Sequence, residues 1–267
     1  MPSYIENKTV LLTGSSGGIG QPLASALAAE GASLIFVGRD KQKLLTQCDQ
    51  LPGTHRIIVA DLSRSEGIQQ FQMEINAFKK LDIIINCIGV NDFNLYEEQD
   101  YSLIHNMIQT NLLGPMFVCR AALPLLRLQS HATILNIGST FGSIGYPGYA
   151  AYSASKFGLR GFTEALRREL IDSNITVHYL SPRAVKTSMN SENVDSLNAM
   201  IGNSVDDPQT VVNAALHQLQ REIGYDQYLG WPEKLFVRLN ALMPKVVSQS
   251  IAKHLPTIYS YFPSPIR

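Results

Sequence analysis

Short apolar runs alternate along this chain with longer amphipathic stretches. The apolar runs have strand length, and the stretches between them show the three- and four-residue spacing of helices. The runs predict strands near residues 8–13, 33–38, 55–60, 82–87, 132–138, 176–181 and 225–229. The stretches predict helices near residues 19–30, 40–51, 65–79, 100–128, 152–172 and 208–223. Three helix starts carry capping signals, namely Asp40, Ser63 three residues ahead of Glu66, and Asp207 before a proline.

This alternation predicts the fold class. Strands joined through helices pair in parallel, and right-handed crossovers place the helices on both faces of the sheet. We therefore expect an α/β fold with a seven-stranded parallel sheet, a single doubly wound Rossmann-like domain over residues 1–230. The 267 residues, 45% of them hydrophobic, suffice for one such domain. Ligands of such folds bind at the carboxyl ends of the strands.

Residues 231–267 form a C-terminal extension with its own pattern. Leucine and valine recur there at alternating spacings of four and three, and Pro244 is expected to divide the run into two helices. No acidic residue follows Glu233, whereas several lysines and arginines do. A basic amphipathic helix can lie on a membrane, which predicts a peripheral membrane contact through residues 233–254. The alternative is that the stripe packs on the enzyme body, roofs the substrate pocket or forms a subunit contact.

A glycine-rich segment, Gly14 to Gly20, links the first predicted strand to the first helix. Glycines let the backbone turn sharply and approach a pyrophosphate, and the start of a helix offers N–H groups and a positive dipole end. In this strand–loop–helix context the segment predicts a dinucleotide cradle. A flexible turn is the alternative interpretation.

Tyr152 and Lys156 stand four residues apart on a predicted helix, so their side chains share one face. A neighbouring cation favours the phenolate and lowers the pKa of a tyrosine, which could then act as a general acid or base. The spacing alone is common on solvated helices. The catalytic interpretation of this pair therefore depends on the other motifs in the chain.

The pattern Gly14-x-x-x-Gly18-x-Gly20 together with Tyr152-x-x-x-Lys156 resembles the short-chain dehydrogenase/reductase family, over residues 8 to about 230. Further motifs of that family follow in its order. The resemblance implies four catalytic residues, which are Asn111, Ser139, Tyr152 and Lys156. It also implies a cofactor site made of Gly14, Ser15, Ser16, Gly18, Ile19, Gly20, Arg39, Asp61, Leu62, Asn86, Gly89, Tyr152, Lys156, Pro182, Val185 and Thr187.

The resemblance further implies roles for the catalytic residues. Ser139 would donate a hydrogen bond to a substrate carbonyl, and Tyr152 would transfer the proton. Lys156 would lower the pKa of Tyr152 and bind the nicotinamide ribose, while Asn111 would hold a water. The chain is then expected to be an oxidoreductase that moves a hydride between a nicotinamide cofactor and a carbonyl or alcohol. A dinucleotide-binding regulatory or scaffold protein without turnover is the alternative.

The end of the second strand bears on cofactor choice. An acidic residue there would favour NAD, but this chain has Gly38 followed by Arg39, whose guanidinium can bind the 2′-phosphate of NADP. The nearby Asp40 and the lack of a basic residue before Gly18 argue the other way. We expect NADP as the cofactor and NAD as the less favoured one.

Residues 188–206 have no single clear period, and the family resemblance implies that this segment covers the substrate. Its apolar residues and those after the fifth strand predict a mostly apolar wall, formed by Met189, Leu197, Met200, Ile201, Phe141, Ile144 and Tyr146. We therefore expect an apolar ketone, aldehyde or acyl-type carbonyl as substrate. Arg183 replaces the glycine that the family has after Pro182, and its side chain could face the cofactor phosphates or the pocket mouth.

Composition narrows the possible partners, metal sites and location of the protein. Lys+Arg and Asp+Glu balance at 22 each, which argues against nucleic acid as a partner. Three distant cysteines without metal-ligand spacing predict reduced thiols and no metal site. The N-terminus lacks an apolar signal region, and no window reaches 18 apolar residues, so we expect a cytoplasmic enzyme with at most surface contact to a membrane. The resemblance implies a homodimer or homotetramer.

Overall fold

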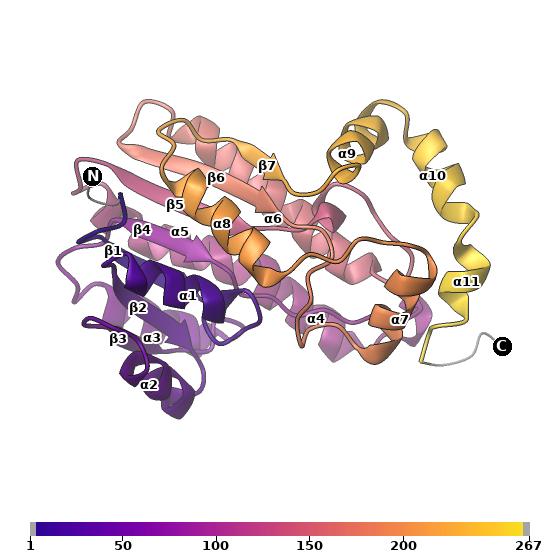
Figure 1. Ribbon diagram of the computed structural model, residues 1–267. Coiled ribbons are helices and arrows are strands. Elements are labelled where there is room, and N and C mark those ends of the chain that lie inside the picture. Colours follow the sequence, from indigo (N-terminus) through magenta and orange to yellow (C-terminus); the bar gives the residue numbers. More distant parts are fainter. Residues whose placement is uncertain (1–3, 264–267) are drawn as a thin grey trace.

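The structure is a computed structural model, which describes residues 4–263. Its centre is one parallel sheet of seven strands in the order β3-β2-β1-β4-β5-β6-β7 (Figure 1). The strands are β1 Thr9–Thr13, β2 Ser33–Gly38, β3 Arg56–Val59, β4 Ile83–Asn86, β5 Ala132–Ile137, β6 Ile175–Ser181 and β7 Asp226–Tyr228. The predicted fold class, an α/β doubly wound sheet with a helical C-terminal extension, is confirmed.

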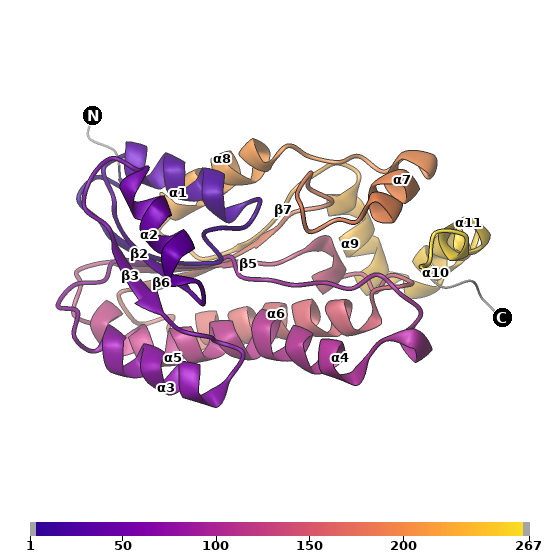
Figure 2. The ribbon, with the colours of Figure 1, turned by 90° about the horizontal axis from the view of Figure 1, so that it is seen from below.

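Helices cover both faces of the sheet, as Figure 2 shows. One face carries α1 (Gly20–Ala29), α2 (Lys41–Asp49) and α8 (Pro208–Leu219). The other carries α3 (Ser65–Ile75), α4 (Tyr101–Ile108), α5 (Gly114–Leu126) and α6 (Ala150–Glu169). The two-residue period of the strands divides the core accordingly. Ile83 and Ile85 of β4 pack toward α1 and α8, whereas Ile84 packs toward α3 and α5.

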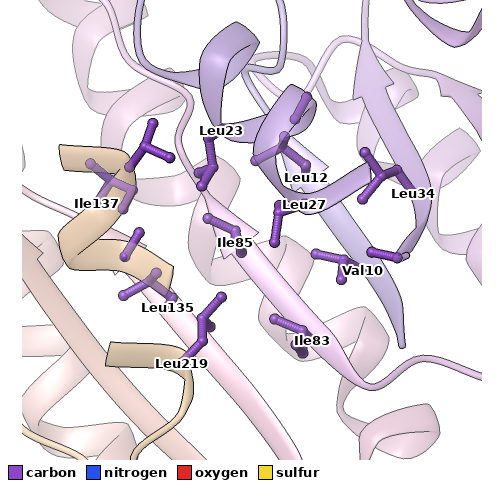
Figure 3. Close-up of a cluster of buried hydrophobic side chains, with 14 of the residues drawn as sticks. Val10, Leu12, Leu23, Leu27, Leu34, Ile83, Ile85, Leu135, Ile137 and Leu219 are labelled. Carbon is purple, nitrogen blue, oxygen red and sulfur yellow. The ribbon is translucent and has the colours of Figure 1, made fainter. Parts of the chain in front are cut away.

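A cluster of buried apolar side chains lies between the sheet and α1 (Figure 3). Leu23 and Leu27 of α1 are fully buried against Leu12 of β1 and Ile85 of β4. Burying a leucine side chain stabilises a fold by roughly 1.5–3 kcal/mol. This packing therefore holds the start of α1 in place next to the glycine-rich loop.

The predicted single helix over residues 100–128 is in fact interrupted. A π turn, Gln109–Leu113, separates α4 from α5. The cause is local, because Pro115 has no N–H and cannot donate the ordinary helical bond to the carbonyl of Asn111. The interruption thus falls at one of the predicted catalytic residues.

The capping predictions are confirmed at two helix starts of three. Asp40 accepts a hydrogen bond from the Lys43 N–H, and Asp207 accepts one from Gln209. The Ser63 capping box is wrong, because the N-cap of α3 is Arg64 and the Ser63 hydroxyl donates to Asp61 instead.

After β6, two parts of the chain extend beyond the carboxyl ends of the strands. The first contains α7 (Glu192–Met200), a helix that the sequence analysis did not predict. The second is the C-terminal extension, with α9 (Glu233–Leu242), α10 (Pro244–Ala252) and α11 (Leu255–Tyr259). Pro244 is the first residue of α10, as expected for the predicted break. None of the helices within residues 4–263 is both long and apolar enough to cross a membrane.

Candidate active site

A large cavity of about 1070 Å³ lies at the carboxyl ends of the strands. It runs from the glycine-rich loop and the end of β2 to α7 and the C-terminal extension. Every predicted site residue lines it except Asn86 and Asn111. The cavity begins between β1 and β4, where the strand order reverses and doubly wound sheets bind their ligands.

The glycine-rich loop has a shape that only glycine permits. Gly14 has φ +69°, and a Cβ there would lie 2.8 Å from the Cys87 backbone. A Cβ on Gly20 would come within 2.1 Å of the Gly14 carbonyl oxygen. Ile19 is the N-cap of α1 and no side chain caps this helix, so its first turn faces the cavity without a competing acceptor from the N-cap. The loop therefore fits a pyrophosphate.

The remaining predicted cradle residues differ in their surroundings. Ser15 is buried and its hydroxyl donates to Gln47 Oε1 at 2.8 Å, so its side chain is directed to α2 rather than into the cavity. Ser16 is exposed at the cavity rim. The Thr187 side chain lies directly over Gly18, since a Cβ on Gly18 would be 2.5 Å from the Thr187 Cβ. The glycine-rich loop and the segment that contains Thr187 are thus neighbours.

The end of β2 presents two cations to the cavity. Arg39 is exposed there, and Lys43, on the first turn of α2, lines the same wall. Sequence analysis missed Lys43, although a cation four residues after Arg39 at a helix start was a usable signal. Asp40 is occupied as the α2 cap. Burial raises the pKa of Asp61, but the Ser63 hydrogen bonds and the charges of Arg39 and Arg64 outweigh it, so that this pKa is lowered overall.

Ser139, Tyr152 and Lys156 converge on one part of the cavity. Ser139 Oγ accepts a hydrogen bond from the Phe141 N–H at 3.1 Å, which leaves its own proton available to donate. Lys156 Nζ donates to the Ile137 carbonyl at 3.2 Å and lies 5.9 Å from the Tyr152 ring centroid. The hydroxyl of Ser139 is also a hydrogen-bond partner of Tyr152.

The pKa shifts in this group differ from the predicted direction. Burial raises the pKa of Tyr152, and the hydrogen bond to Ser139 only partly opposes the rise. Burial also lowers the pKa of Lys156 to about 8. The predicted lowering of the Tyr152 pKa is therefore wrong for the protein alone, because both groups are enclosed and burial disfavours the charged form of each.

Asn111 and Asn86 lie behind the cavity wall. Asn111 Oδ1 accepts from the Val90 N–H, and its Nδ2 donates to the Val90 carbonyl and to Ser155 Oγ. Both N–H groups of this side chain are therefore used within the protein. The role implied for Asn111, to hold a water, stays a prediction. Asn86 Nδ2 donates to Asn136 Oδ1 at 2.8 Å, because strand alternation turns it toward α5 and α6.

Tyr179 of β6 contacts Ser139, and sequence analysis did not identify it as a site residue. It is fully buried in β6, and its hydroxyl is 3.3 Å from the Ser139 N–H, which donates to it. A Cβ on Gly138 would lie 2.1 Å from the Tyr179 ring, so the glycine makes room for this contact. Nothing in a strand-like sequence distinguishes such a tyrosine from an ordinary core residue.

Beyond the catalytic group the cavity wall is aromatic and aliphatic. Phe141 and Tyr146 stack with centroids 5.1 Å apart, and Tyr149 packs edge-on against Tyr152. The predicted apolar residues line the cavity with one exception, Met200, which is 66% exposed on the outer side of α7. The C-terminal extension completes this wall with Phe236, Leu239, Val246, Val247 and Ile251.

Arg183 lies at the cavity mouth and joins two segments. Its Nη2 donates to Asp206 Oδ1 at 2.7 Å, and its Nη1 is 3.3 Å from Glu233 Oε2. Asp206 ends the segment that carries α7, and Glu233 begins α9. The orientation of the guanidinium, which the sequence left open, is set by these two carboxylates.

A glycine cradle at the strand-order reversal, with a tyrosine, a lysine and a serine in the same cavity, defines a dinucleotide-binding oxidoreductase domain. A family model described as short chain dehydrogenase matches residues 8–198. The chain belongs to this family, and it is therefore expected to act on a carbonyl or hydroxyl group with a nicotinamide cofactor.

Curated relatives agree with this placement. The chain is 32% identical to 3-oxoacyl-[acyl-carrier-protein] reductase from Bos taurus over 187 residues, covering 70% of this chain and 79% of the relative. It is 31% identical to the enzyme of the same name from Escherichia coli K12 over 185 residues, covering 69% and 76%.

Solved structures share the fold. A short-chain dehydrogenase from Streptomyces avermitilis superposes with a TM-score of 0.77 at 22% identity, over 93% of this chain and 98% of the other. A 3-ketoacyl-(acyl-carrier-protein) reductase from Brucella melitensis, complexed with NADH, gives 0.73 at 23% identity, over 84% and 98%. A serine dehydrogenase complexed with NADP+ gives 0.73 at 25% identity, over 83% and 94%.

Proposed function

We propose that the protein is an NADP(H)-dependent oxidoreductase that interconverts a carbonyl and an alcohol on an apolar, acyl-type substrate. The observation that carries this proposal is that Ser139, Tyr152 and Lys156 line one cavity together with the glycine cradle at one end and an apolar chamber at the other. A cofactor held at the cradle and a substrate in the chamber would meet at these three side chains.

A bound nicotinamide supplies or accepts the hydride. The chain's residues act on the oxygen, where negative charge develops as the hydride reaches the carbon. Ser139 donates its hydroxyl proton in a hydrogen bond to that oxygen, because its lone pair is already engaged by the Phe141 N–H. Tyr152 gives its proton to the oxygen in reduction and takes one from the alcohol in oxidation.

Lys156 has a supporting role in this proposal. One of its N–H groups is used by the Ile137 carbonyl, so the others remain to stabilise the Tyr152 oxygen and to bind a ribose hydroxyl. Asn111 is a positioning residue in this proposal, because its hydrogen bonds link the loop at Val90 to Ser155 of α6. These bonds hold the loop after β4 next to the helix that carries Lys156.

The proposal of NADP rests on charge at the end of β2. Arg39 and Lys43 both line the cavity there, while the Asp40 carboxylate is engaged as a helix cap. Lys43 also lies 3.9 Å from Asp40 Oδ2, so Arg39 is the cation that best suits a 2′-phosphate. The solved relatives include complexes with NADH and with NADP+, so the argument depends on these side chains.

The substrate class is proposed from the chamber. Its wall is built from aromatic and aliphatic side chains of Phe141, Tyr146, Leu197 and the C-terminal extension. Arg183, the cation at its mouth, is held by Asp206 and Glu233 and is not available to clamp a substrate carboxylate. The names of the curated relatives, 3-oxoacyl-[acyl-carrier-protein] reductases, support an acyl-type carbonyl.

We further propose that residues 1–230 form the catalytic domain, that the protein assembles as a homodimer or homotetramer, and that it acts in the cytoplasm. The assembly follows from the family resemblance, and the three free cysteines in the described structure suit a reducing compartment. Light scattering after gel filtration would measure the assembly directly.

The decisive experiment is the substitution Tyr152→Phe, assayed as NADPH oxidation against a panel of ketones and aldehydes. We expect cofactor binding to be kept and turnover to fall by at least about 100-fold, the scale of a lost general acid. Tyr149→Phe, which removes a hydroxyl from the same cavity wall, is the matched control and should keep most of its turnover.

Near-normal turnover in Tyr152→Phe would contradict the proposed mechanism. Tight NADPH binding by the unaltered protein without turnover of any carbonyl would favour the regulatory or scaffold alternative instead.

A further inference from the structure

The C-terminal extension has an inner and an outer surface of different chemistry. On the inside, Val237 and Val247 are buried with Ile144 in a small apolar cluster, and this contact seats α9 and α10 on the chamber. In Figures 1 and 2 the helices α9 to α11 project past the carboxyl ends of the strands, away from both helical layers. Their outer side therefore stands clear of the body of the molecule.

The C-terminal extension carries several large apolar side chains that are highly exposed. Leu242 is 82% exposed and Trp231 is 72% exposed. The exposed set within 16 residues of sequence consists of Trp231, Leu235, Phe236, Leu242, Met243 and Val246. A cluster of exposed apolar residues is unfavourable in water and marks a contact surface.

Two members of this set also belong to the cavity. Phe236 and Val246 line the chamber and are nevertheless 41% and 42% exposed. These two residues therefore belong both to the chamber wall and to the exposed apolar set of the extension.

Cations flank the apolar side chains. Lys234, Arg238, Lys245 and Lys253 are all exposed on the same helices. No acidic residue follows Glu233 in the sequence, and Glu233 itself is paired with Arg183. The surface is thus cationic and apolar at once. Anionic lipid bilayers attract such surfaces, because the cations meet the head groups while the apolar side chains enter the interface.

We propose that this outer surface, residues 231–253, docks on an anionic lipid bilayer and opens the chamber toward it. Delivery of an apolar substrate from the bilayer rests on the proposed function, whereas docking itself does not. A second copy of the chain, paired face to face, would bring like charges together, and an acidic carrier protein would be drawn by the cations alone, whereas Trp231 and Leu242 are exposed beside them. The bilayer accounts for both features.

Docking is measured by co-sedimentation of the full-length protein with two kinds of vesicle, phosphatidylcholine alone and phosphatidylcholine mixed with phosphatidylserine. We expect binding to the mixed vesicles that weakens as salt rises. The double substitution Leu242→Gln with Met243→Gln, and separately Arg238→Glu with Lys245→Glu, should each lower the bound fraction by about tenfold. None of these four residues lines the cavity.

Matched controls separate docking from general surface effects. Ile223, also 82% exposed, lies outside the extension, so Ile223→Gln should bind vesicles as the unaltered protein does. Lys79→Glu is the corresponding charge control. Thermal unfolding of each variant establishes that the fold is kept, and turnover of a small water-soluble ketone should be the same in all of them.

Several results would overturn the proposal. These are equal binding to both kinds of vesicle, no binding to either, or equal loss in the Ile223→Gln control. A change of oligomeric state in the Leu242 and Met243 variant without vesicle binding would assign the surface to a second copy. Capture of an acyl carrier protein by Arg238 and Lys245 without vesicle binding would assign it to that partner. Vesicle binding by a protein without carbonyl turnover would support docking and refute only the proposed function.

Discussion

Lys156 is a cation placed where charge is unfavourable. The residue is 4% exposed, and burial lowers its pKa from 10.5 to about 8. Between these two values the unfolded chain binds the proton that the folded chain has released, so the stability contribution of Lys156 rises with pH in this window. Below pH 8 both states are protonated and the folded protein bears the full cost of burying the charge.

Replacing Lys156 with Met should therefore stabilise the protein at pH 7 while abolishing turnover. The lowered pKa of Lys156 corresponds to about 3 kcal/mol of destabilisation at pH 7, which the substitution removes. Loss of the hydrogen bond to the Ile137 carbonyl costs about 1 kcal/mol of this gain. We expect a net gain of roughly 2 kcal/mol in the free energy of unfolding by urea, shrinking as pH approaches 10. A destabilised variant at pH 7, or a difference that does not change with pH, would show that Lys156 is not strained in this way.

Arg39 supplies a second test at the scale of a single residue. Arg39→Ala should weaken NADPH binding by about 1.5–3 kcal/mol, the range for hydrogen bonds to a charged group, and leave NADH binding almost unchanged. Fluorescence titration with both cofactors measures this. Lys41→Ala, an exposed cation on α2 outside the cavity, is the matched control. Equal losses for both cofactors would mean that Arg39 does not contact the 2′-phosphate.

Among the elements, the connection between the α7 segment and α9 depends on Arg183. Its side chain is 18% exposed and its guanidinium holds Asp206, whose side chain is 11% exposed. Arg183→Met would leave the largely buried Asp206 carboxylate without its partner, and we expect a loss of about 2 kcal/mol in the free energy of unfolding. Proteolysis should then cut the C-terminal extension faster.

The matched comparison is Arg168→Met, which breaks the exposed pair with Glu164 on α6. Exposed pairs contribute about 0–1 kcal/mol, so this variant should stay close to the unaltered protein. If both substitutions cost the same, Arg183 does not fasten the two segments.

The elements that sequence predicted well are those with one strong period. The strands are short runs of apolar residues, and α1, α2, α6 and α8 have apolar positions on one face, so the bounds of these elements are within a few residues of those expected. The helix α7 was missed although Ser191 caps it and Val194 and Leu197 share a face, because its apolar residues serve a cavity rather than the sheet. The π turn depends on Pro115, whose effect on the carbonyl four residues earlier is a matter of backbone geometry.

The candidate site was predictable where the chemistry depends on backbone shape or on motif order. The cradle glycines and the tyrosine, lysine and serine meet in one cavity, as the motifs implied. What could not be predicted is which side chains are occupied by other partners. Ser15 bonds to Gln47, and Asn111 bonds to Val90 and Ser155, through contacts between residues more than 20 apart in sequence.

At the scale of the whole molecule, the size and polarity of the chamber predict a preference for long apolar substrates. A buried methylene contributes about 0.8 kcal/mol, which corresponds to at most about a fourfold gain in kcat/KM for each added methylene. We expect kcat/KM to rise along a series of straight-chain ketones or acyl-type carbonyls until the chamber is filled. A flat series, or a preference for small charged sugars or keto acids, would contradict the apolar chamber.

The division of the cavity between two stretches of chain has a consequence for how this enzyme could be diversified. The family match ends at residue 198, yet Phe236, Leu239, Val246 and Ile251 form part of the wall that a substrate would touch. In the proposed function, the residues for proton transfer and cofactor binding lie in the matched stretch, and part of the substrate wall lies in the stretch that follows it. Exchanging the segment after Gly230 between related chains should transfer chain-length preference while leaving cofactor preference with the parent.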